Sequence, residues 1–301
     1  MATTLTSLAA RVAADNAIMA AVTGIAAIRN FSTSFKELAA RKGSAIRVPI
    51  FASTGGARDF NKASNNYAQN DKEVTGTDVL VDKHIIKGVE YDDIDFLECD
   101  VQFWEGAGKI IGDELARGIA SYVLSFINKT EVPKTAANEL VFTASKANFA
   151  MLRAQCAKAG IKPEDTTVLL DPIRFASMLS DLDTSLYGGT EAIRGGYIPS
   201  LFGFAAVTEC GQLSQDPEEK LVGALVVRDS IAVAGRYLEP GTKDSYAEVG
   251  KVSDEKSGLT LGIRRFGDPK TGENYLSGEA LFGAKLLQPT KIVRLVSEAT
   301  A

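Results

Sequence analysis

One segment of the sequence, TDVLVDKHIIKGVEY at 77–91, constrains the fold more than any other. Apolar and polar residues alternate along most of it, which predicts a β-strand with one apolar face. At about 3.3 Å per residue the strand would be about 50 Å long, whereas typical strands have about 5–6 residues. AIRVPIF at 45–51 predicts a shorter partner strand, which Pro49 confines to a sheet edge. A two-stranded hairpin of this length cannot bury its own apolar face, so we expect something outside the hairpin to cover it.

The composition excludes several classes of protein. The 301 residues are 45% hydrophobic and 24% charged, which is typical of a globular chain and not of a disordered or collagen-like one. A compact chain of this size would bury about three quarters of its surface, enough for one large or two medium cores. The net charge of −5 argues against an electrostatic nucleic-acid binder. Three scattered cysteines favour a reducing compartment, and the longest apolar run, 17–28, is too short to span a membrane.

Helices and strands mix along the rest of the chain, which predicts the class α+β. Residues 1–43 predict an alanine-rich helical arm, and 100–129 predict one long helix with an apolar stripe. Glycines inside a helix cost about 1 kcal/mol each. The four in this helix therefore indicate that another backbone approaches closely, or that its first turns are irregular. Further elements are expected as a helix at 144–159, a strand, turn and helix at 166–179, strands at 204–210 and 221–228, and mainly strands after 244.

No motif in the sequence supports a chemical mechanism. GAGKIIG at 106–112 lacks the third glycine of a dinucleotide-binding loop, and a lone histidine, His84, excludes sites that need a His pair. An acidic run that contains Asp92, Asp93 and Asp95 could hold Mg²⁺ or Ca²⁺. The dipole of the helix that follows explains the run more simply. We therefore expect no catalytic residue, metal or cofactor. A soluble metal-dependent α+β enzyme that uses these three aspartates remains the alternative from another class.

The order of these parts resembles that of the tailed-bacteriophage major capsid proteins of the Hong Kong 97 fold. Several segments resemble the family in their amino-acid sequence as well as in their order: TTVLLDPIRFASML at 166–179, GGYIPSLFGFAAV at 195–207, ALVVRDSIAVAGR at 224–236, GLTLGIRRFGDPKTG at 258–272 and LFGAKLLQPTKIVRLV at 281–296. The resemblance covers nearly the whole chain. It implies a fold with five parts in sequence. These are an N-terminal arm at 1–43, an E-loop hairpin at 44–91, a P-domain with the spine helix at 92–141, an A-domain mainly at 142–250, and C-terminal strands at 251–301 that return through the P-domain and A-domain.

The resemblance also implies a structural function, with no enzymatic activity. Pentamers and hexamers of the chain would form an icosahedral phage head around double-stranded DNA, without sequence-specific binding and without a membrane. Assembly would occur in the host cytoplasm and the protein would reside in the virion. A portal, a separate scaffolding protein and decoration proteins would be its partners. An encapsulin-type bacterial compartment shell is the alternative within the same fold.

In this family the E-loop lies over a neighbouring subunit, which would cover the apolar face of the hairpin. The resemblance therefore gives candidate contacts between subunits: Arg58, Phe60, Lys62, Tyr67, Val79, Val81 and Ile85. One branch of the family links its subunits through a Lys–Asn isopeptide bond. Lys62 and Lys72 lie in the expected E-loop, but no acceptor can be assigned from the sequence, and we predict no cross-link.

Overall fold

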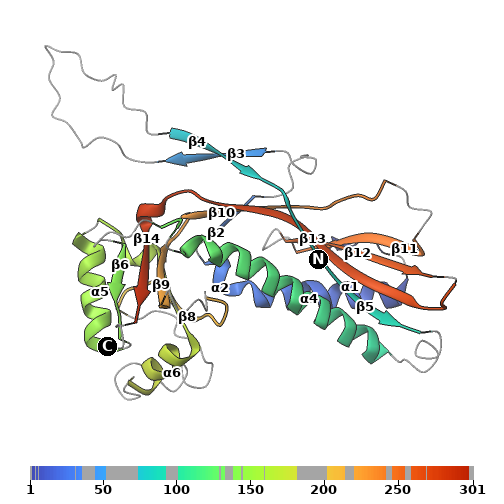
Figure 1. Ribbon diagram of the computed structural model, residues 1–301, viewed down its shortest axis with the longest axis horizontal. Helices are drawn as coiled ribbons and strands as arrows, with labels where there is room; N and C mark the ends of the chain where they lie inside the picture. Colours follow the sequence, from blue (N-terminus) through green and yellow to red (C-terminus); the bar gives the residue numbers. More distant parts are fainter. Residues whose placement is uncertain are drawn as a thin grey trace, which may run out of the picture.

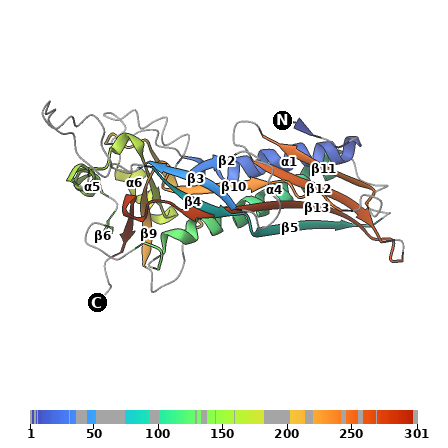
Figure 2. The same cartoon turned by 90° about the horizontal axis from the view of Figure 1, so that it is seen from above.

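The computed structural model consists of two β-sheets with their helices and a separate two-stranded hairpin (Figure 1). The structure describes residues 2–3, 5, 7–30, 32–35, 45–51, 74–92, 101–128, 130–132, 138–143, 145–158, 160–181, 202–213, 220–241, 246–254, 259–268 and 270–297. The larger sheet and two helices form an elongated body, and the smaller sheet stands at one end of it (Figures 1 and 2).

Two helices lie side by side through the elongated body. Helix α1 (Leu8–Gly24) begins after Ser7, whose hydroxyl accepts a hydrogen bond from the Ala10 amide at 3.3 Å. The short helix α2 (Ala26–Arg29) follows it directly. Helix α4 (Val101–Leu124) continues into a 3₁₀ turn, η1 (Ser125–Ile127). The expected long helix is therefore confirmed, with ends a few residues inside the predicted ones.

The contact between α1 and α4 depends on glycine. A Cβ atom on Gly108 would overlap the carbonyl oxygen of Ala13, and one on Gly112 would overlap that of Ala17. Another backbone does approach these glycines closely, as the sequence predicted. In contrast, nothing lies within 4 Å of a Cβ built on Gly106.

The larger sheet has seven strands, six of them in the order β1-β11-β12-β13-β10-β2. The seventh, β5, pairs with β13 and lies off this path. The strands are β1 (Ala2–Thr3), β2 (Ser32–Phe35), β5 (Lys83–Tyr91), β10 (Ile231–Arg236), β11 (Glu248–Ser253), β12 (Thr260–Gly267) and β13 (Asn274–Leu286). All pairs are antiparallel except β10 with β2. Leu276, Ala280 and Phe282 of β13 share a buried core with Ile111 and Leu115 of α4, so this face of the sheet packs on the helices.

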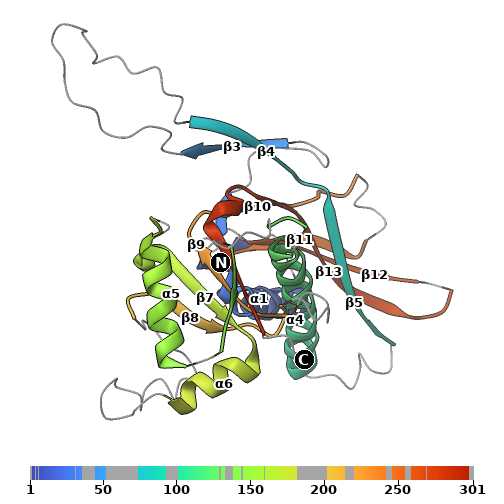
Figure 3. The same ribbon diagram turned by 60° about the vertical axis from the view of Figure 1, so that its left-hand side comes forward.

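The smaller sheet has five strands in the order β6-β14-β9-β7-β8. They are β6 (Glu139–Val141), β7 (Thr166–Leu170), β8 (Ala206–Glu209), β9 (Leu221–Val227) and β14 (Ile292–Val296), and the short turns η2 (Pro163–Asp165) and η3 (Pro289–Lys291) precede β7 and β14. Helices α5 (Lys146–Lys158) and α6 (Pro172–Asp181) cover one face through Phe149, Leu152, Phe175 and Met178 (Figure 3). The other face joins the core of the elongated body through Leu169 and Val226.

The structure corrects two expectations from the sequence. The segment 77–91 is not one strand, because β4 (Val74–Leu80) pairs with β3 (Ala45–Phe51) whereas β5 pairs with β13. Residues 32–35 of the expected helical arm form strand β2, paired with β10. Strand β10 belongs to the larger sheet although it lies within 142–250, β11 crosses residue 250, and β6 belongs to the smaller sheet although it precedes residue 142.

Candidate assembly site

The base of the hairpin packs on its own chain. Val79 and Val81 are fully buried, together with Ala232 and Ala234 of β10 and Leu281 of β13. Figure 2 shows the hairpin lying across these strands. The expectation that another subunit covers Val79 and Val81 is therefore corrected. The apolar face of the hairpin base packs on the face of the larger sheet that points away from α4.

The crossing of hairpin and sheet is close. A Cβ atom on Gly283 of β13 would overlap the carbonyl oxygen of Leu80. The Lys285 ammonium donates a hydrogen bond of 3.2 Å to the carbonyl oxygen of Asp78. On the opposite side of the hairpin, the Leu80 side chain remains 50% exposed. Backbone contact at one glycine and a small apolar cluster thus fix the direction in which the hairpin leaves the body.

The other predicted contact residues divide into two groups. Ile85 of β5 is half-buried and packs against the core of the elongated body, and a Cβ atom on Gly118 of α4 would lie 3.0 Å from its Cδ1. The side chains of Arg58, Phe60, Lys62 and Tyr67 lie outside the described residues, as does Lys72. The structure thus does not bring the seven candidates together on one described surface.

A buried charge cluster attaches β5 to the sheet, and sequence reasoning missed it. The Glu279 carboxylate, 6% exposed, accepts hydrogen bonds from Nε and Nη2 of Arg264 at 2.9 and 2.6 Å. Its other oxygen lies 3.0 Å from Nε2 of His84. Burial by itself would lower the pKa of Arg264, but the hydrogen bonds and charge of Glu279 outweigh it and raise that pKa. The one acidic residue of β13, Glu279, is directly followed by the apolar run Ala280–Phe282, and this was the signal that could have identified the cluster.

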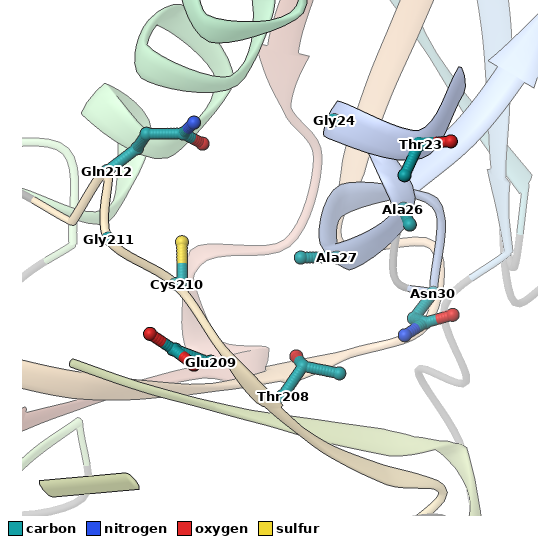
Figure 4. A pocket seen from close by; sticks show the side chains of 10 residues that line it. All are labelled: Thr23, Gly24, Ala26, Ala27, Asn30, Thr208, Glu209, Cys210, Gly211 and Gln212. Carbon is teal, nitrogen blue, oxygen red and sulfur yellow. The ribbon is translucent and has the colours of Figure 1, made fainter. Parts of the chain in front are cut away.

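A cavity of about 430 Å³ lies between the α1–α2 junction and β8. Figure 4 shows Cys210 on one side of this space and Ala26 and Ala27 on the other. Burial raises the pKa of the Cys210 thiol, which keeps it protonated and makes it a poor nucleophile. This cavity is therefore a packing gap between the α1–α2 junction of the elongated body and strand β8 of the smaller sheet.

The alternative metal site gains no support from the described part of the chain. Asp92 lies exposed directly after β5, and Asp93 and Asp95 lie outside the described residues. Nowhere in the described ranges do three or more His, Cys, Asp or Glu side chains gather in a way that could hold a metal ion. Within the same ranges, no helix is both long and apolar enough to cross a membrane.

Comparison with known proteins identifies the fold. No family model matches the chain, and no curated protein resembles it in sequence. Among solved structures, the capsid of Ralstonia phage GP4 superposes with a TM-score of 0.60 at 10% identity, over 90% of this chain and 88% of that one. A chain of Gordonia phage Cozz gives 0.58 at 14% identity, over 92% and 87%. The virus-like particle from Pyrococcus furiosus gives 0.51 at 12% identity, over 93% and 98%.

These likenesses extend over 90% to 93% of this chain, so they concern its overall fold. The protein is a mixed helix-and-sheet chain with the fold of shell-forming proteins. More particularly, its fold is that of the tailed-phage major capsid proteins, as the sequence predicted.

Proposed function

We propose that this protein is the structural subunit of an icosahedral phage head, which assembles from pentamers and hexamers of the chain around double-stranded DNA. The observation that carries the proposal is the agreement of fold over about nine tenths of the chain with capsid structures. Its role in this proposal is structural, and the virion assembled in the host cytoplasm is its location.

The hairpin supports this proposal. Only its base contacts the rest of the chain in the described structure, through the cluster around Val79 and Val81. The 22 residues between β3 and β4 contain Arg58, Phe60, Lys62 and Tyr67, which we propose to contact a neighbouring subunit. If these side chains meet a neighbouring subunit, association would bury the apolar ones among them, which favours the contact. Portal, scaffolding and decoration proteins are the further partners in this proposal.

A second candidate is an encapsulin-type compartment shell, which the likeness to the virus-like particle from Pyrococcus furiosus favours. The two candidates predict the same kind of shell and differ in its contents. A phage head would hold double-stranded DNA, whereas a compartment shell would hold a cargo protein.

The test is size-exclusion chromatography and negative-stain microscopy of the full chain after expression, followed by analysis of the particle contents. We expect shells, tubes or rings of subunits. Nuclease-protected DNA in particles from infected cells would support the phage head, and a co-purifying protein cargo would support the compartment shell. A chain that stays monomeric at every concentration and salt condition would contradict both.

A further inference from the structure

We propose that helix α1 binds a helix of another protein along its solvent-facing side, and that this partner helix carries a basic residue where it meets Asp15. The surface is a row of side chains along α1, which we call the α1 stripe. Its members are Leu8, Val12, Asp15, Met19 and Val22. The inference goes beyond the proposed function and does not depend on shell formation, because it concerns a surface of the single chain.

The α1 stripe has the spacing of a coiled-coil seam. Its five members follow one another at intervals of four, three, four and three residues. Side chains at these intervals lie along one side of a helix. An apolar row with this period is the surface against which a second helix packs its own row, knobs into holes. The spacing therefore selects a helix as the occupant.

The fold leaves the α1 stripe open to solvent. The alanine-rich side of α1 is buried, and it is this side that meets α4. On the stripe, Leu8 is 72% exposed and Met19 is 56% exposed, whereas Val12 and Val22 are partly buried against the core of the elongated body. A helix that is apolar on both sides is typically buried on both. Within the described ranges, only one side of α1 is covered.

The arrangement of helices on the larger sheet has a place for the partner. Helix α4 contacts β13 and β5, and helix α1 contacts β11 and β12, so the two form one layer on the sheet. Figure 2 shows α1 on the β11 side of this layer. The next position lies beside α1 on the side away from α4, towards strand β1 at the sheet edge. No helix that the structure describes lies there, so a partner helix would extend the layer.

The α1 stripe is held on a rigid element. The Ser7 amide donates a hydrogen bond of 2.8 Å to one carboxylate oxygen of Glu248, and the Ser7 hydroxyl donates to the other. These bonds tie the start of α1 to β11. The close contacts at Gly108 and Gly112 fix its middle against α4. Little conformational entropy is therefore lost when a partner docks.

Asp15 decides the kind of partner. It lies at the centre of the α1 stripe, and its carboxylate forms no hydrogen bond or ion pair with any residue that the structure describes. A carboxylate that becomes buried in a seam costs free energy unless a cation meets it. Two copies of α1 in register would bring Asp15 against Asp15 in either orientation, which disfavours a second copy. A different helix with Lys or Arg at its central seam position pairs the charge and fixes the register.

Peptide binding to dissociated subunits of the full chain tests this inference. The probe is a labelled synthetic helix of three heptads, with leucine at the seam positions and lysine at the central one. A second peptide carries glutamate in place of that lysine. By fluorescence anisotropy, we expect the lysine peptide to bind the unmodified chain about tenfold more tightly than the glutamate peptide. Asp15→Lys should reverse this preference, because the central position faces Asp15 in both parallel and antiparallel binding.

A matched pair of variants tests the apolar part of the α1 stripe. Met19→Gln should weaken binding of the lysine peptide by about tenfold, because it removes an apolar side chain from the contact. Its urea unfolding should stay unchanged, since the Met19 side chain is exposed in the chain alone. The control is Ile110→Gln on α4, 52% exposed and two residues from both Gly108 and Gly112, which places it on the side away from α1. It should change neither quantity.

Three results would overturn the inference. One is that neither peptide binds, or that both bind equally well. Another is a clear loss of stability in Met19→Gln, which would show that a segment of the same chain covers the α1 stripe. The third is self-association of the unmodified chain that Met19→Gln abolishes, which would place a second copy there. The proposed function stands in the first two cases, because shell formation is measured separately on the unmodified chain. It fails only if that chain never assembles.

Discussion

Two close contacts in this molecule use glycine in the same way but lie in different surroundings. Between α1 and α4, Gly108 and Gly112 let the helix backbones approach within the largest core of the protein. At the base of the hairpin, Gly283 lets β4 cross β13, and the apolar cluster beside it is much smaller. The difference shows that the body has a deeply buried centre, whereas the hairpin is attached through a local patch. We therefore expect damage at the first contact to unfold the chain and damage at the second to release only the hairpin.

The largest effect is expected for Gly112→Leu. The new side chain would drive α4 away from Ala17, because its Cβ atom has no room beside that carbonyl oxygen. We expect the free energy of unfolding to fall by about 3 kcal/mol or more, measured by urea denaturation of dissociated subunits. The matched control is Gly106→Ala in the same helix, where a Cβ meets nothing within 4 Å. It should raise the free energy of unfolding by about 0.5–1 kcal/mol, and equal losses in the two variants would contradict the proposed close contact.

An intermediate effect is expected for Gly283→Ala. Its Cβ atom would displace Leu80 and so lift β4 from the sheet. We expect a loss of about 1–3 kcal/mol, with faster amide hydrogen exchange in β3 and β4 and unchanged exchange in α4. Gly235→Ala in β10 is the control, because the nearest atom to its Cβ is 4.0 Å away, and it should leave exchange in the hairpin unchanged. Uniformly faster exchange through α4 would show that the hairpin base and the body unfold as one unit.

The same contrast explains which parts of the fold the sequence could predict. Local periodicity predicts helix α4, strand β7 and helix α6. Asp171 and Pro172 predict the turn between β7 and α6, and the structure contains all of these elements. The break at Val81–Asp82 has no local signal, because the apolar residues before and after it share one alternating phase. What changes there is the partner strand, from β3 to β13, and that choice depends on residues almost two hundred positions away.

The candidate site was predicted less well, for a related reason. His84 was correctly placed on a strand, but its partner Glu279 lies 195 residues further along the chain. Leu8 and Met19 looked like ordinary apolar residues of a helix, since periodicity gives the face of a residue without showing whether anything covers it. The surface proposed to bind a partner helix depends on which apolar side chains stay exposed after folding. That property belongs to the packed chain and not to any segment of it.

The smallest effect on stability is expected in the segment between β3 and β4, for Phe60→Ser combined with Tyr67→Ser. If these aromatic side chains contact a neighbouring subunit, their loss should leave the urea unfolding and circular dichroism of dissociated subunits unchanged. Assembly, followed by sedimentation velocity, should be impaired. Val79→Ala at the hairpin base provides the contrast, because a buried valine loses burial and leaves a cavity within the chain. It should cost about 2 kcal/mol before any assembly begins. A comparable loss of stability in the Phe60 and Tyr67 variant would place those side chains in a core of their own chain, and the segment between β3 and β4 would then have the same role as the hairpin base.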